Sequence, residues 1–93
     1  MTEPSPKTKE ATFFVYLLRC SDGSLYTGIA ANVSARLSVH DKGKGAKYTR
    51  GRLPVSLVYQ ERLESKSLAL KREIQVKKLS RRQKDALVQN QAR

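Results

Sequence analysis

A series of five side chains in this 93-residue chain has the types and the spacing to act together on phosphate groups. In chain order they are Tyr16, Tyr26, Arg36, His40 and Glu73. An arginine fork binds phosphate oxygens and stabilises the charge that develops on them, and a histidine can hold or donate a proton near neutral pH. Arg36 and His40 are one helical turn apart, so one edge of a helix would present both. Taken singly, such residues are more often ordinary surface or packing side chains.

Glu73 is conspicuous because acids are scarce around it. The chain carries a formal net charge of +11, and residues 11–60 include only two acids. On a helix, Glu73 would lie beside Ala69, Leu70 and Val76, at the margin of an apolar stripe. A half-buried, isolated carboxylate suits one divalent cation that completes its shell with water and substrate phosphate, as Mg²⁺ does. A structural pair with a lysine or arginine is the alternative, and the shortage of acids excludes a two-metal site.

The composition indicates a polyanionic partner. Nineteen Lys and Arg residues stand against eight Asp and Glu residues, a balance that favours salt-dependent association with nucleic acid. A solubilising surface or a ribosome-associated protein would also explain the charge. With one cysteine and one histidine, a disulfide and a zinc module are excluded. Since no apolar run reaches membrane-spanning length, no membrane association is expected, and we predict a cytoplasmic protein.

Hydrophobic runs and turn residues divide the chain into short elements. Residues 1–11 are polar and predict a disordered lead-in, and residues 12–90 predict a single domain. Strands are expected over residues 13–19, 25–30 and 53–61, and helices over 32–43, 65–79 and from 80 onward. The order ββαβαα predicts an α+β fold, a small antiparallel sheet with helices packed against it.

Local signals support these boundaries. Asn32 and Ser65 are good helix N-caps, and Ser80 with Gln83 forms a capping box. Val55, Leu57 and Tyr59 alternate along the third strand, whose start Pro54 confines to an edge or first position. Cys20 is expected to be inert packing.

The turn of the first hairpin decides whether Tyr16 and Tyr26 can share a site. A two-residue Asp-Gly turn would put the two tyrosines on opposite faces of the sheet. A three-residue or bulged turn, which would pair Tyr16 with Ala30, puts both on one face. We predict this second turn, because a shared site requires it. Gly28 would then lie on the same face, where its missing side chain leaves room for substrate or a helix.

Residues 42–52 hold five basic residues, three glycines and no acid, and therefore predict a loop. The loop fits no Walker pattern. Its side chains are more suited to holding a nucleic-acid backbone, with an aromatic ring for stacking on a base. The residues concerned are Lys44, Lys47, Arg50 and Arg52 for the backbone and Tyr48 for the base. A solvated flexible loop is the alternative.

Together these residues resemble a known family. Phe14-Val15-Tyr16, then Tyr26-Thr27-Gly28, then Arg36, His40 and Glu73 follow the order and spacing of the GIY-YIG endonuclease superfamily, specifically its small stand-alone, single-domain members. The segment 43–50 is also typical of these members, and the likeness covers residues 13–79. Two motif positions differ, Phe-Val-Tyr for Gly-Ile-Tyr and Thr27 for isoleucine, but neither change removes a chemical group.

The resemblance implies a three-stranded antiparallel sheet flanked by helices and metal-dependent phosphodiester hydrolysis. Tyr16 would be the general base or its orienter, and Tyr26 would position water or phosphate. Arg36 would stabilise the transition state, His40 would assist proton transfer, and Glu73 would hold a single Mg²⁺ or Mn²⁺. A phenol with a pKa near 10 is a poor base, so nearby cations and the metal are expected to lower the pKa of Tyr16.

The sequence thus predicts a metal-dependent endonuclease that hydrolyses DNA, with single-stranded or branched repair intermediates as candidate substrates. A separate targeting protein is a candidate partner, since no additional targeting domain is evident. The alternative is a non-catalytic, basic nucleic-acid-binding module of the same fold. A ribosome- or protein-bound adaptor is a third class, which would show no preference for free nucleic acid.

Overall fold

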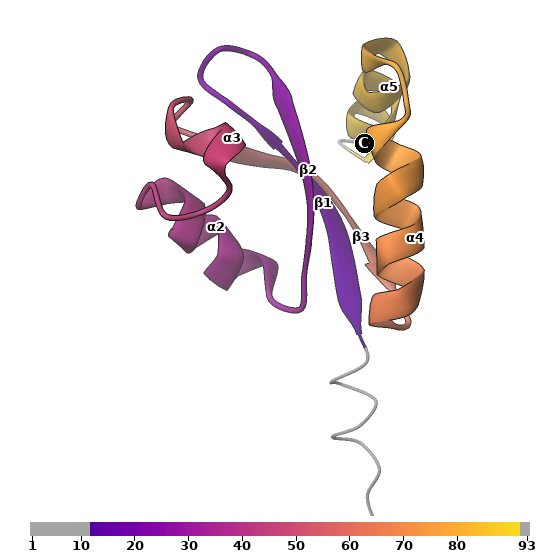
Figure 1. The fold of residues 1–93 in the computed structure, drawn as a ribbon. Coiled ribbons are helices and arrows are strands. Elements are labelled where there is room, and N and C mark those ends of the chain that lie inside the picture. The colour runs from indigo at the N-terminus through magenta and orange to yellow at the C-terminus, as the bar shows by residue number, and fades with distance from the viewer. Residues whose placement is uncertain (1–11, 92–93) are drawn as a thin grey trace, which may run out of the picture.

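The structure, a computed structural model, describes residues 12–91. The predicted lead-in, residues 1–11, lies outside the described residues. The elements follow in the order β1 (Phe13–Arg19), β2 (Leu25–Ala30), α2 (Val33–Asp41), α3 (Lys47–Arg50), β3 (Ser56–Leu63), α4 (Lys66–Lys77) and α5 (Arg81–Gln91). They form three layers, with α2 and α3 on one face of the sheet and α4 and α5 on the other (Figure 1). The predicted α+β fold with a three-stranded antiparallel sheet is confirmed.

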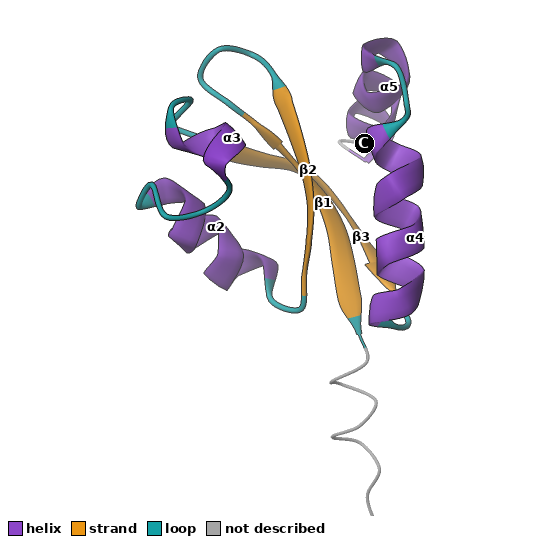
Figure 2. Ribbon diagram, viewed as in Figure 1, coloured by secondary structure: helices purple, strands orange, loops and turns teal. Residues whose placement is uncertain are grey.

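The expectation that residues 42–52 are a plain loop is wrong in one part, since α3 lies within them (Figure 2). This short helix has no capping side chain of the usual kind. Instead, Thr49 is fully buried and its hydroxyl donates to the carbonyl of Ala46 at 2.9 Å. Since the same hydroxyl lies 2.8 Å from Nδ1 of His40 on α2, a contact with another element helps to hold this helix in place.

The strand order is β2-β1-β3, so the apolar run of β1 is central and buried on both faces. Val15 and Leu17 face α4 and α5 in one hydrophobic core, and Tyr16 and Leu18 belong to the other, together with Cys20. Each face of the small sheet thus has its own core, and Tyr16 lies in the core covered by α2.

The hairpin between β1 and β2 places Tyr16 and Tyr26 on one face, as predicted. Tyr16 lies opposite Gly28, however, and not opposite Ala30. The turn consists of three residues, Ser21 to Gly23. Its last position requires a left-handed backbone, which Gly23 supplies with a φ of 85°. A shift of two residues keeps every side chain on its face.

The alternation predicted for the third strand is broken by a β-bulge. β1 pairs Leu17 with Tyr59 but Leu18 with Leu57, so one residue of β3 is extra. Leu57 therefore packs in the core under α2, whereas Tyr59 packs in the core under α4. The strand also begins at Ser56 and not at residue 53, after a cis peptide bond before Pro54.

All three predicted helix starts are confirmed. Asn32 accepts from the N–H of Ala35 at 3.0 Å, and Ser65 accepts from the N–H of Leu68 at 3.1 Å. Ser80 and Gln83 form the reciprocal bonds of a capping box at 3.1 and 2.9 Å. Within residues 12–91, no helix is long and apolar enough to cross a membrane.

Candidate active site

Three aromatic residues predicted from the sequence converge on the α2 side of the sheet. Tyr16 comes from β1, Tyr26 from β2 and His40 from the last turn of α2. The ring centroid of His40 lies 6.2 Å from that of Tyr16 and 5.4 Å from that of Tyr26, and the two tyrosine rings are 6.5 Å apart. Tyr16 and His40 are buried, and Tyr26 is half-buried. The same-face hairpin is what makes this arrangement possible.

A chain of hydrogen bonds fixes the roles of the two nitrogens of His40. Thr49 Oγ1 has one hydrogen, which it donates to the carbonyl of Ala46. It must therefore accept from Nδ1–H of His40, 2.8 Å away. Nε2 of the neutral ring is then an acceptor, and the hydroxyl of Tyr16 donates to it at 3.2 Å. The phenol is thus linked to a group that can take its proton.

The electrostatics of the site favour the neutral forms of both residues. Burial is the largest effect on Tyr16 and raises the pKa of its phenol, which the hydrogen bond and charge of Arg36 oppose. Burial likewise lowers the pKa of His40, and the charge of Arg36 lowers it further, against a smaller effect of Asp41. Arg36 therefore lowers the pKa of Tyr16, as expected of a neighbouring cation, but desolvation outweighs this effect and the pKa is raised.

Two glycines allow the close packing of this site. A β-carbon on Gly28 would lie 2.6 Å from the hydroxyl oxygen of Tyr16, so the phenol itself fills the space that we expected to be left for substrate or a helix. A β-carbon on Gly45 would lie 2.7 Å from Cγ of His40. Gly45 and Thr49 were not identified as site residues from the sequence. Their one signal was their place in the family-like segment 43–50, which does not show which residues touch His40.

Arg36 is exposed on α2, next to the buried phenol of Tyr16. Helical spacing puts it one turn before His40, so the guanidinium and the imidazole approach Tyr16 from one helix. An exposed guanidinium beside the buried, hydrogen-bonded pair of Tyr16 and His40 can bind a phosphate group that arrives from solvent.

Glu73 approaches from the other layer. It lies on α4, which packs against β1 and β2, and its charge raises the pKa of Tyr16, although other effects on that phenol are larger. The side chain is 17% exposed, as expected for the margin of an apolar stripe, and it pairs with Nζ of Lys77 at 3.4 Å. The lysine pair that the sequence left open is therefore present.

The donors at Glu73 fit one hard divalent cation. Lys77 is 56% exposed and can leave the carboxylate when a cation takes its place. Among the described residues, no group of three or more His, Cys, Asp or Glu side chains could hold a metal ion together. A cation at Glu73 would thus take its other ligands from water and substrate phosphate, which is how Mg²⁺ commonly binds.

The basic residues predicted to bind nucleic acid divide into two groups. Lys44, Lys47 and Arg50 are exposed, although Arg50 also donates from Nε to the carbonyl of Gly45 at 3.4 Å. Arg52 is engaged within the protein, because its Nε pairs with Asp22 at 2.9 Å. The first group therefore presents the freer charge to a nucleic-acid backbone.

Tyr48 extends the aromatic group of the site. Its ring stacks on that of Tyr26, with centroids 6.0 Å apart and planes inclined by 30°. The guanidinium carbon of Arg52 lies 4.1 Å from the centre of the Tyr48 ring, and its Nη1 donates to the carbonyl of Tyr48 at 2.7 Å. Tyr48 and Arg52 thus support Tyr26, while the Tyr48 ring remains 40% exposed.

Comparison with known proteins agrees with this geometry. The family model described as the GIY-YIG catalytic domain matches residues 12–86. A UPF0213 protein of Natronomonas pharaonis is 55% identical over 78 residues, covering 84% of this chain and 92% of the relative. A UPF0213 protein of Staphylococcus aureus strain Mu3 is 57% identical over 75 residues, covering 81% and 92%. The names of these relatives state no activity.

A solved structure supports the fold. The solution NMR structure of the UPF0213 protein BH0048 from Bacillus halodurans is 50% identical and has a TM-score of 0.55, covering 84% of this chain and 83% of that one. Nucleases with this domain act on nucleic acids and generally use a divalent metal ion. From the matched domain, the convergence of Tyr16, Tyr26 and His40, and this solved relative, we conclude that the chain belongs to the GIY-YIG endonuclease superfamily.

Proposed function

We propose that this protein is a metal-dependent endonuclease that hydrolyses DNA phosphodiester bonds, with single-stranded and branched repair intermediates as its candidate substrates. The observation that carries the proposal is the hydrogen-bonded chain from Tyr16 through His40 to Thr49, with the exposed Arg36 beside it. A tyrosine with a purely structural role would not need a histidine partner on the same helix edge that carries Arg36, a residue suited to binding phosphate.

The chain supports general base catalysis by relay. As the oxygen of a water molecule bonds to phosphorus, the bond from phosphorus to the leaving oxygen of the strand breaks, and that oxygen keeps the electron pair and takes a proton from solvent. The attacking water loses a proton, which the oxygen of Tyr16 accepts while the phenol's own proton passes to Nε2 of His40. The imidazolium formed keeps Nδ1–H on Thr49. Because burial raises the pKa of Tyr16 and lowers that of His40, the phenol is protonated and the imidazole neutral before this step.

The remaining residues stabilise charge and hold the phosphate. Arg36 binds a non-bridging oxygen and stabilises the negative charge of the transition state. Tyr26, supported by its stack on Tyr48, positions the attacking water or the phosphate. Glu73 would hold the single Mg²⁺ or Mn²⁺, which would supply further charge stabilisation at the phosphate oxygens. Lys44, Lys47 and Arg50 bind the backbone of the strand on either side.

The test is cleavage of single-stranded, duplex and branched DNA and RNA in Mg²⁺, Mn²⁺ or EDTA. We expect metal-dependent cutting of DNA, lowered about 10²–10³-fold by Arg36→Ala and about 10²–10⁴-fold by Tyr16→Phe, with little loss of binding. Glu73→Gln should abolish the metal-dependent cutting. Glu64→Gln is the matched control, because Glu64 is an exposed glutamate that pairs with Arg62 away from the site.

Two outcomes would contradict the proposal. Cleavage by Glu73→Gln at the wild-type rate would show that Glu73 does not hold the metal ion. Tight binding without cutting on every substrate would favour the non-catalytic binding module, and substitutions of Lys44 or Lys47 would then have the largest effects.

A further inference from the structure

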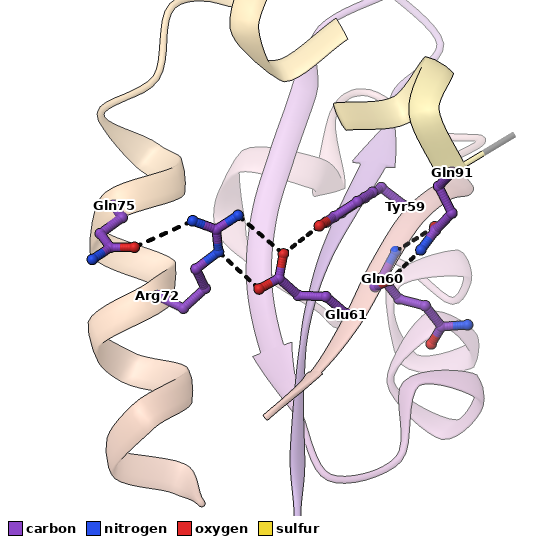
Figure 3. Close-up of polar contacts among 6 residues, drawn as sticks. All are labelled: Tyr59, Gln60, Glu61, Arg72, Gln75 and Gln91. Atoms are coloured by element: carbon purple, nitrogen blue, oxygen red, sulfur yellow. Dashed lines mark hydrogen bonds and ion pairs between the residues drawn. The ribbon is translucent and has the colours of Figure 1, made fainter. Parts of the chain in front are cut away.

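A polar cluster joins β3 to α4 on the face of the sheet opposite Tyr16. We call it the Glu61 cluster; its members are Tyr59, Glu61, Arg72 and Gln75. Glu61 lies between Tyr59 and Arg72 (Figure 3), accepting from the Tyr59 hydroxyl and from two nitrogens of Arg72, Nε at 2.8 Å and Nη2 at 3.2 Å. Nη1 of Arg72 donates to Oε1 of Gln75 at 3.2 Å. The guanidinium is therefore held by a two-point contact to another element and by its own helix.

The position of Arg72 on α4 relates it to Glu73. Ala69 and Val76 are the fully buried residues of this helix. Arg72 lies three residues after Ala69 and four before Val76, whereas Glu73 lies four after and three before. With 3.6 residues per turn, the two charged residues flank the buried stripe on opposite sides. Arg72 is bound to the edge strand β3, so Glu73 lies on the side of the helix away from β3, toward the rest of the sheet.

Apolar packing alone specifies the rotation of α4 about its axis only weakly. The two fully buried residues are small, and the larger apolar side chains Leu68, Leu70 and Ile74 remain 46%, 42% and 54% exposed. A narrow stripe of this kind tolerates rotation, because turning the helix exchanges little buried area. The bidentate pair between Arg72 and Glu61 does not tolerate it, because a planar fork binds a carboxylate in one orientation. With side chains 31% and 24% exposed, the pair is also partly shielded from water.

We propose that the Glu61 cluster positions Glu73, holding α4 in the one rotation that turns the Glu73 carboxylate away from β3 and toward the rest of the sheet. Arg72, Glu61 and Tyr59 are thus positioning residues for the metal-binding carboxylate, although none of them lies on the face of the sheet that carries Tyr16 and Tyr26. This inference rests on the proposed metal-binding role of Glu73.

The test uses Arg72→Lys, which keeps the charge but loses the fork, and Glu61→Gln, which keeps the shape but loses the charge. The control is Arg62→Gln, since Arg62 lies next to Glu61 on β3 and forms an exposed pair with Glu64, just after the strand. The first readout is Mn²⁺ titration of the full chain without nucleic acid, followed by the paramagnetic broadening of the Gly28 amide signal in NMR spectra. Glu73→Gln serves as the reference that removes the site. The second readout is the Mn²⁺ concentration at half-maximal cleavage, measured separately from the rate at saturating Mn²⁺.

We expect Arg72→Lys and Glu61→Gln to weaken Mn²⁺ binding about tenfold, while the cleavage rate recovers at saturating Mn²⁺ and Arg62→Gln behaves like the wild type. The double variant with Glu61→Arg and Arg72→Glu should regain part of the affinity. A purely structural role would lower the melting temperature without separating metal affinity from rate. If either single variant fails to fold, Tyr59→Phe, which removes one hydrogen bond, replaces it and should show a smaller change in the same direction.

The proposal is overturned if folded Arg72→Lys and Glu61→Gln titrate with Mn²⁺ as the wild type does. This failure differs from failure of the proposed function. A wild-type protein that cuts nothing, but whose Gly28 broadening requires Glu73 and weakens in Arg72→Lys, would refute the nuclease and support the positioning role.

Discussion

His40 makes both of the contacts on which the proposed chemistry depends, and neither partner is its neighbour in the sequence. Tyr16 is 24 residues away and Thr49 nine. The spacing of Arg36 and His40 predicted that both lie on one edge of a helix, and both approach Tyr16. What spacing could not predict is burial, which removes the imidazole from solvent and reverses the expected direction of the Tyr16 pKa. A pKa depends on the whole shell around a group, and most of that shell comes from other elements.

The lowered pKa of His40 predicts an acid-sensitive stability and activity. The unfolded chain takes up a proton on this residue near pH 6.5, whereas the folded protein resists protonation because burial disfavours the charged ring. The stabilisation is therefore complete above about pH 6.5 and is lost as pH falls through the lower pKa of the folded state. Cleavage should fall in the same window, because a protonated His40 cannot accept the proton of Tyr16.

Urea unfolding at a series of pH values, compared between the wild type and His40→Gln, measures this effect. The variant should lose less stability on acidification and should cleave about 10²-fold more slowly at neutral pH. Because other acidic groups titrate equally in both proteins, the difference between the two curves isolates His40. Parallel curves would show that this residue does not titrate with folding.

At the scale of elements, helix starts follow from a few adjacent residues, and all three were predictable. Asn32, Ser65 and the Ser80–Gln83 box act through bonds to the next few backbone groups. The short helix α3 and the bulge in β3 were not predictable in this way. The helix depends on the burial of Thr49, and the bulge depends on how β3 meets β1. Both are decided by partners distant in the sequence.

The cap of α2 should matter for function, and the cap of α5 should not. Asn32→Ala and Ser80→Ala should each lower the free energy of unfolding by about 1 kcal/mol, because each leaves a backbone N–H at a helix start without its acceptor. The first turn of α2 closes with the bond from the N–H of Arg36 to the carbonyl of Asn32, at 3.1 Å. Fraying this turn should loosen Arg36 and slow cleavage.

Urea denaturation and the cleavage assay together check this prediction. Ser80→Ala is the control, since its helix lies on the opposite face of the sheet from Arg36 (Figure 1). An Asn32→Ala protein with wild-type stability, or equal losses of cleavage in the two variants, would contradict it.

At the scale of the whole molecule, the net charge of +11 sets how the protein meets its partner. Exposed lysines lie on both sides of the sheet, at Lys44 and Lys47 on the α2 side and at Lys71 on α4 and Lys78 at its C-cap on the other. Charge of this size speeds encounter with any polyanion and makes binding salt-dependent. If the protein binds its substrate in one orientation, Lys44 and Lys47, on the side of the candidate site, contribute more to binding than the lysines on the opposite side of the sheet.

The salt dependence of DNA binding tests this asymmetry. For duplex DNA, each phosphate contact contributes about 0.9 to the slope of log affinity against log salt concentration. The double variant Lys44→Gln and Lys47→Gln should therefore reduce the slope by about two contacts. Lys71→Gln with Lys78→Gln changes the net charge equally and should leave the slope nearly unchanged. Equal changes in both double variants would mean that the charge acts over the whole surface and not through the site.

By itself, the sequence determined the features that depend on short spacing. These are the three helix caps, the strands β1 and β2, and the family membership that the motif residues carry. Turn chemistry, capping and side-chain periodicity act over a few residues, so they can be recognised in the sequence. The prediction centred the turn one residue too late, which shifts the pairing of the two strands by two residues. Because side chains alternate between the faces with a period of two, Tyr16 and Tyr26 still lie on one face.

Only the tertiary structure decided which groups meet across elements. It brought Thr49 and Gly45 to His40 and bound Arg72 to Glu61. None of these pairings lies within one helix or strand. Burial and long-range contact depend on the packing of whole elements against one another, and that packing also sets the electrostatics of Tyr16.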